Sequence, residues 1–184
     1  VWVRLSLYSI AFFFFVIGLS RPQIGARLKE QEIKGAEIII AMDVSNSMLA
    51  EDYSPNRLER AKLAVSRLVD KLRDDRIGLV IFAGTSFVQL PVTTDYVSAK
   101  MFLNSIDTGS IPIQGTALGD AIKTCIRSFS QQSDKSRAII LITDGENHED
   151  DPVSAAKEAA DMGIKVFTIG VGSPEGKPIP MNGE

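Results

Sequence analysis

The chain has 184 residues, of which 45% are hydrophobic and 23% charged, and its net charge is −3. This composition is typical of a globular protein and argues against a disordered chain. The slightly acidic balance and the lack of a long basic block argue against nucleic-acid binding, which requires a basic surface.

The first segment, residues 1–20, is strongly apolar and contains four consecutive phenylalanines. A helix over residues 1–19 would be ~28 Å long, close to the hydrocarbon thickness of a bilayer. We therefore predict a transmembrane helix over residues 1–20 that tethers the chain to a membrane. A cleaved signal peptide is the alternative, because Gly18 and Ser20 are small enough to flank a cleavage site. Residues 21–35 are polar and are predicted to form a linker.

Strands and helices alternate in the pattern of residues 36–184, which we predict to form one domain. The predicted strands are 37–42, 77–83, 87–92, 138–143 and 164–171. The predicted helices are 58–72, started by a capping box at Asn56 and Glu59, then 95–106, 117–129, and 152–163 after the cap at Asp151. This order predicts an α/β fold with a doubly wound, mostly parallel sheet and helices on both faces. The short connection at residues 84–85 predicts that strand 87–92 is an antiparallel edge strand.

Cys125 is the single cysteine of the chain, so no intrachain disulfide can form. It lies in a segment whose apolar residues recur at helical spacing, which favours a small buried hydrophobe. A nucleophilic cysteine would need a nearby base, and the chain contains one histidine. We therefore predict that Cys125 is structural.

Oxygen-bearing side chains gather where three predicted loops should meet. In a doubly wound sheet the site lies at the carboxyl ends of the strands, where the strand order reverses. Asp43, Ser45 and Ser47 follow the first strand, Thr116 precedes the helix 117–129, and Asp144 follows the strand 138–143. Two carboxylates and three hydroxyls suit a hard divalent cation, and two negative charges balance its charge. Five donors leave one octahedral position open for an Asp or Glu of a partner.

Each of these residues also has an ordinary structural explanation. Asp43, Ser45 and Ser47 could form Asx and Ser/Thr turns, and Thr116 could be a helix N-cap. Asp144 with the following glycine is a common turn pair. Their joint placement at the edge selected by the sheet topology favours a metal site.

The same five residues resemble the metal-ion-dependent adhesion site (MIDAS) of von Willebrand factor A domains. The resemblance covers residues 36–172. It implies that Ser45, Ser47 and Thr116 bind Mg²⁺ through their hydroxyls, and that Asp43 and Asp144 bind it directly or through water. Mn²⁺ and Ca²⁺ are alternative ions. The resemblance also implies that the last strand and helix of such a domain lie beyond residue 184.

Three further stretches resemble the bacterial aerotolerance (Bat) proteins, and within them the BatB-like members. These stretches are residues 21–23, 47–52 and 55–62. The resemblance implies an inner-membrane protein whose A domain lies on the periplasmic side. It implies as partners other Bat-type A domains or a MoxR-type AAA ATPase system. The basic residues after the apolar segment favour the cytoplasmic side instead, and we follow the resemblance.

The function predicted from these features is metal-dependent binding of a protein partner that supplies an acidic residue, without catalysis. The first alternative is a metal-dependent hydrolase. An aspartyl-phosphate enzyme would need an Asp where Ser45 stands, and a serine hydrolase would need a histidine partner. His148 lies in an acidic stretch where Glu146 could tune the ion, and no Gly-x-Ser-x-Gly elbow is present. A scaffold that binds partners without metal is the second alternative.

Overall fold

The computed structural model describes residues 2–19, 35–130, 135–145 and 150–173, with side chains omitted for 16–19. The chain divides into two units, residues 1–32 and 33–184. The predicted linker over residues 21–35 lies almost wholly outside the described residues.

The first unit contains helix α1, Trp2–Leu19, so the predicted helix is present. Across the described ranges, however, no helix is sufficiently long and apolar to span a bilayer. The transmembrane span predicted over residues 1–20 is therefore not found among these residues.

The second unit is built on one sheet of five strands in the order β3-β2-β1-β4-β5. The strands are β1 (Glu37–Asp43), β2 (Arg76–Phe82), β3 (Ser86–Thr93), β4 (Arg137–Thr143) and β5 (Ile164–Gly170). All neighbouring strands are parallel except β2 and β3, which pair antiparallel. The prediction of a mostly parallel sheet with one antiparallel edge strand is confirmed.

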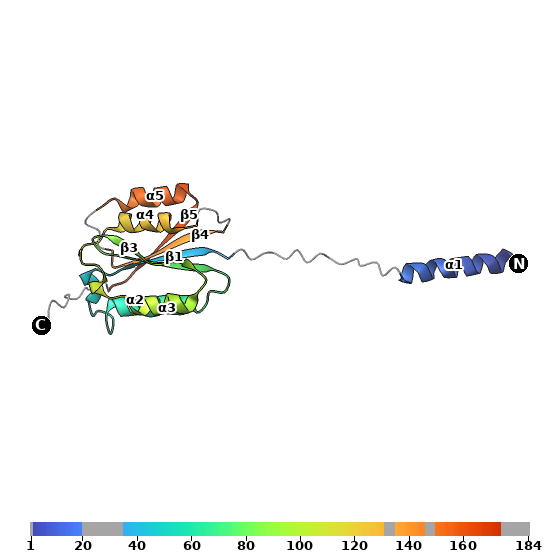
Figure 1. Cartoon of the computed structure of the whole chain (residues 1–184), viewed down its shortest axis with the longest axis horizontal. Helices are drawn as coiled ribbons and strands as arrows, with labels where there is room; N and C mark the ends of the chain where they lie inside the picture. Colours follow the sequence, from blue (N-terminus) through green and yellow to red (C-terminus); the bar gives the residue numbers. More distant parts are fainter. Residues whose placement is uncertain (1, 20–34, 131–134, 146–149, 174–184) are drawn as a thin grey trace. The chain divides into compact units, whose positions relative to one another are not determined.

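Within the described residues, helices cover both faces of this sheet (Figure 1). They are α2 (Arg57–Val69), α3 (Tyr96–Asn104), α4 (Leu118–Ser128) and α5 (Pro152–Asp161). Helices α2 and α3 lie on one face, and α4 and α5 lie on the other. Two short 3₁₀ helices, η1 (Asn46–Leu49) and η2 (Thr108–Ser110), lie between the predicted strands and helices.

Two of the predicted helix starts are confirmed by side-chain caps. The Asn56 side chain accepts a hydrogen bond from Glu59 N at 2.9 Å. The Asp151 side chain accepts from Val153 N and Ser154 N, each at 3.1 Å. Such caps satisfy backbone donors that a helix start leaves free, so α2 and α5 begin where the sequence indicates.

Strand β1 is buried on both faces because its apolar side chains alternate between two cores. Ile40 and Met42 belong to the cluster with residues of α2 and α3. Ile39 and Ala41 belong to the cluster with residues of α4 and α5. The alternation follows from the two-residue period of a strand. Both cores therefore hold β1 in place, and its carboxyl end has a well-determined position.

Cys125 is fully buried in the core beneath α4. Burial raises the pKa of its thiol to about 12. A thiol with so high a pKa is not ionised at neutral pH, which agrees with the predicted structural role.

We predict that Ile40→Ala lowers the free energy of unfolding by about 2–5 kcal/mol, because it leaves a cavity at a fully buried position. Urea unfolding monitored by circular dichroism measures this. Val97→Ala is the matched control, since Val97 is 81% exposed and its loss should change the stability by less than about 0.5 kcal/mol. Equal effects of the two substitutions would contradict the assigned core.

Candidate metal-binding site

The candidate site lies at the carboxyl end of β1, at the point where the strand order reverses. Strand β1 has β2 on one side and β4 on the other. The chain continues from β1 to β2 through α2, and later returns to the other side of β1 as β4. The loops that follow β1 and β4 therefore open next to each other, as the switch-point rule predicts.

Asp43 is the last residue of β1 and is fully buried. Its Oδ1 accepts a hydrogen bond from Ser45 N at 2.9 Å, which is the Asx turn considered above. Its Oδ2 accepts from Thr143 Oγ1 at 2.8 Å, which joins the ends of β1 and β4. Burial raises the pKa of the Asp43 carboxyl to about 6, and the negative charge of Asp144 adds to this rise.

Ser45 and Ser47 are buried in the loop after β1, with 5% and 7% of their surfaces exposed. Their hydroxyl oxygens lie 2.9 Å apart. Ser45 occupies the N-cap position of η1, yet its side chain does not cap the helix. Its hydroxyl is therefore bonded to the second hydroxyl of the site instead of to the backbone.

Thr116 is buried beside the same edge of the sheet, with 4% of its surface exposed. It does not cap α4, because the N-cap residue is Ala117 and no side-chain cap is formed. Its loop is attached to the end of β2 by the Ala117 N to Ala83 O bond of 2.7 Å. A second bond of 3.0 Å runs from Asn46 N to the Gln114 side chain. Among the described residues, no hydrogen bond joins Thr116 directly to the other four predicted ligands.

Asp144 directly follows β4, and its side chain is 2% exposed. Its Oδ2 accepts a hydrogen bond from Arg57 Nη1 at 2.9 Å. Its Oδ1 is buried and has no hydrogen-bond partner in the described part of the chain. Buried polar atoms are nearly always paired, so an unpaired carboxylate oxygen indicates a place for a ligand.

The site includes three residues to which the sequence pattern assigned no role. Thr143 positions Asp43, and Arg57 together with Asp52 holds Asp144. A signal for the latter pair was present, because both residues lie in the stretches that resemble Bat proteins. The contact of Arg57 with Asp144 spans 87 residues of sequence, so only the fold reveals it. Glu146 and His148 lie outside the described residues.

The donor set fits a hard divalent cation. It combines buried carboxylates and hydroxyls at one edge of the sheet, and one carboxylate oxygen is unpaired. The described residues contain no group of three or more His, Cys, Asp and Glu side chains that could hold a metal ion. The five predicted ligands include two such residues, and the other three are hydroxyls.

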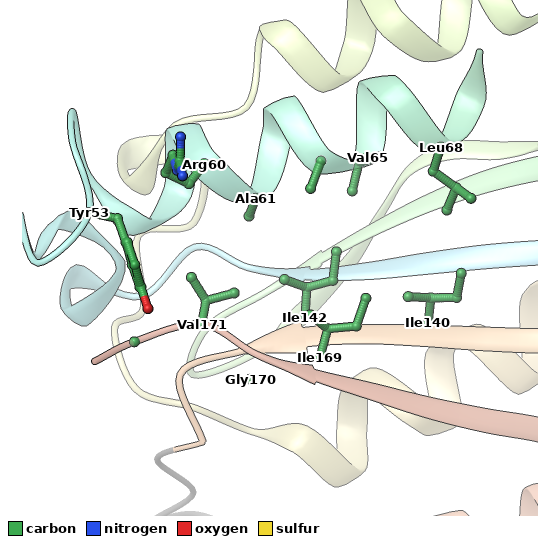
Figure 2. A pocket seen from close by; sticks show the side chains of 12 residues that line it. Tyr53, Arg60, Ala61, Val65, Leu68, Ile140, Ile142, Ile169, Gly170 and Val171 are labelled. Atoms are coloured by element: carbon green, nitrogen blue, oxygen red, sulfur yellow. The ribbon is translucent and has the colours of Figure 1, made fainter. Parts of the chain in front are cut away.

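An apolar pocket of ≈ 400 Å³ lies between α2 and the strands β4 and β5 (Figure 2). Its walls are formed mainly by Val65, Leu68, Ile140, Ile142 and Ile169, with Tyr53 and Arg60 at one end. The pocket contains none of the five predicted ligands.

Two solved structures share this fold at high sequence identity. BatB from Bacteroides thetaiotaomicron, a conserved hypothetical protein, is 59% identical, with a TM-score of 0.79 over 82% of this chain and 73% of that chain. An aerotolerance-related membrane protein from Bacteroides fragilis, carrying multiple mutations to serines, is 54% identical, with a TM-score of 0.78 over 82% and 74% of the two chains. The predicted resemblance to BatB-like aerotolerance proteins is confirmed.

More distant proteins share the fold alone. Proximal thread matrix protein 1 from the mussel byssus, solved with a zinc-occupied MIDAS motif, is 22% identical, with a TM-score of 0.66 over 76% of this chain and 36% of that chain. The chain spans about half the length of the curated relatives that it matches, 50% of one and 57% of another.

The sequence model of the von Willebrand factor type A domain matches residues 37–180, which include every strand of the sheet and all five predicted ligands. The match therefore covers the whole described sheet and the loops at the carboxyl ends of its strands. The chain belongs to the von Willebrand factor type A domain family.

Proposed function

We propose that this domain binds a partner protein through a divalent metal ion held at the carboxyl end of β1. The observation that carries the proposal is the buried and incompletely paired group of oxygen donors there. Asp43 is fully buried, and Asp144 has a buried oxygen without a hydrogen-bond partner. Two buried carboxylates are costly without a compensating positive charge, and a divalent cation supplies it.

In this proposal the hydroxyls of Ser45, Ser47 and Thr116 hold the ion together with the carboxylates of Asp43 and Asp144. Mg²⁺ is the ion that we propose, and Mn²⁺ and Ca²⁺ suit the same oxygen donors. That the mussel protein was solved with zinc in its MIDAS motif supports a metal at this place in the fold. The ion would neutralise the buried charge and accept a carboxylate from the partner.

The partner that we propose presents an Asp or Glu side chain. Domains of this family commonly mediate protein–protein interactions. The similarity to aerotolerance proteins supports another Bat-type A domain, or a component of a MoxR-type AAA ATPase system, as the partner. That one similar protein is described as a membrane protein supports a location at a membrane. We propose the bacterial inner membrane, with the domain on the periplasmic side, as the resemblance to Bat proteins implies.

We further propose that the site does not catalyse a reaction. The hydroxyls of Ser45 and Ser47 are bonded to each other. In the described part of the chain neither hydroxyl has a histidine or lysine as a hydrogen-bond partner. A serine nucleophile needs such a base to become reactive.

We predict that saturating Mg²⁺ or Mn²⁺ raises the melting temperature of the chain by about 5–10 °C at roughly 100 times the dissociation constant, because the ion binds only the folded state. Thermal unfolding with the ion and with a chelator measures this shift. Asp43→Ala should abolish the shift. Asp70→Asn, which removes an exposed carboxylate at the other end of α2, should keep it. No shift in the wild type would contradict the metal site.

We predict that Asp43→Asn stabilises the metal-free chain by about 1–3 kcal/mol at pH 8. The pKa of Asp43 rises from 3.8 to about 6 on folding, so its ionised form costs up to about 3 kcal/mol. The cost is present above pH 6, decreases as the pH falls from 6 to 3.8, and is absent below 3.8. Urea unfolding in chelator should therefore show that Asp43→Asn is more stable than the wild type at pH 8, and that this difference nearly disappears at pH 4. A loss of stability at pH 8 would contradict this assignment.

We predict that immobilised chain retains its partner from a cell-envelope extract in Mg²⁺ and releases it in chelator, because the ion bridges the two proteins. Asp43→Asn should retain nothing, whereas Asp70→Asn should behave like the wild type. Replacing the contacting Asp or Glu of the partner by Ala should abolish retention. Equal retention with and without Mg²⁺ would favour the metal-free scaffold.

A further inference from the structure

Arg57 contacts two carboxylates of different roles at the first turn of α2. Its Nη1 donates to Asp144 Oδ2 at 2.9 Å. Its Nε and Nη2 donate to Asp52 Oδ1 and Oδ2, each at 2.9 Å. The side chains of Arg57, Asp52 and Asp144 are only 11%, 1% and 2% exposed. The three groups therefore form one buried ionic network beside the candidate metal site.

The charges of this network explain why the positively charged Arg57 can lie next to Asp144, a proposed ligand of the metal ion. Arg57 alone would cancel the charge of Asp144 and weaken the attraction for a divalent ion. Asp52 accepts three of the four charged hydrogen bonds that Arg57 donates to the two carboxylates, and these bonds lower the pKa of Asp52 to about 2, so it stays ionised. Arg57 and Asp52 together are neutral, and the net charge of Asp43 and Asp144 remains available to the ion.

Arg57 also fixes the orientation of the Asp144 carboxylate. Arg57 engages Oδ2, whereas Oδ1 is buried and unpaired within the described residues. A carboxylate held by one oxygen cannot rotate freely, so the other oxygen keeps its orientation. The guanidinium thus selects which oxygen of Asp144 is offered to a ligand.

The network is supported by the backbone that follows β5. Ser173 N donates to Asp52 Oδ2 at 2.7 Å. A Cβ atom placed on Gly172, which borders the pocket of Figure 2, would lie 3.4 Å from Arg57 Cζ. The backbone after β5 therefore holds Asp52 through Ser173 N and passes close to the guanidinium.

We propose that Arg57 and Asp52 form a charge-neutral clamp that positions the Asp144 carboxylate for the divalent ion. The inference rests on the proposed metal-dependent function and assigns Arg57 as a positioning residue of that site. Asp52 acts through Arg57, because it cancels the charge and orients the guanidinium.

The test is to titrate Mn²⁺ into the whole chain and to measure its binding affinity by isothermal titration calorimetry. Asp52→Asn keeps the shape of the side chain but leaves the cation uncompensated, and Arg57→Lys keeps the charge but loses the planar fork. We expect each to weaken Mn²⁺ binding about 10-fold or more, as for other residues that orient metal ligands. The double variant Asp52→Asn/Arg57→Gln restores the wild-type net charge and should recover part of the affinity lost in Asp52→Asn.

Asp70→Asn and Arg60→Lys are matched controls, because they make the same chemical changes on exposed side chains outside the clamp. Both should bind Mn²⁺ like the wild type. Melting temperatures in chelator separate the proposed role from a merely structural one. If the clamp were only structural, its variants would melt at lower temperatures in chelator and bind Mn²⁺ as tightly as the wild type. If Asp52→Asn does not fold, Arg57→Lys and the double variant, compared with the wild type, decide the question.

The outcomes distinguish the clamp from the function on which it rests. A wild type that binds no Mn²⁺ overturns the metal site, and the clamp with it. A wild type that binds Mn²⁺ no more tightly than Arg57→Lys and Asp52→Asn overturns the clamp alone. A double variant that binds no more tightly than Asp52→Asn overturns the charge cancellation.

Discussion

The burial of two carboxylates at the end of the central strand is the constraint on which the rest of this structure depends. Asp43 is fully buried, and Asp144 is nearly so. Burial raises the pKa of the Asp43 carboxyl to about 6, and the negative charge of Asp144 adds to this rise. A fold that keeps such a pair needs a compensating charge, and the divalent cation that we propose would supply it. In this proposal the stability lost in the metal-free state is regained when the ion binds.

The position of this pair follows from the sheet. Strand β1 is apolar on both faces, so it occupies the centre of the sheet between two cores. The strand order reverses at β1, because β2 lies on one side of it and β4 on the other, so the loops at its carboxyl end lie next to each other. The bond from Thr143 to Asp43 then joins the ends of β1 and β4 and brings Asp144 beside the first loop. Packing thus places the charges, and hydrogen bonds orient them.

The network of Arg57 and Asp52 extends the site beyond its predicted ligands. It connects Asp144 with the start of α2 and with the backbone after β5. The same backbone borders the apolar pocket between α2 and β5. The proposed metal site and this side of the sheet therefore share structural elements, because the backbone after β5 also contacts Asp52.

The sequence by itself determined the strand and helix order, the antiparallel edge strand and the helix caps at Asn56 and Asp151. These features depend on local periodicity and on short polar motifs, which are readable along the chain. It also indicated Asp43, Ser45, Ser47, Thr116 and Asp144 as candidate ligands, because the topology selects the carboxyl ends of the strands.

Only the tertiary structure decided which partners these side chains have. The bond of Thr143 to Asp43 spans 100 residues, and that of Arg57 to Asp144 spans 87. Such contacts have no periodic signal, since they depend on how separate elements pack. The same holds for the unpaired oxygen of Asp144, because burial is a property of the whole fold and not of the local sequence.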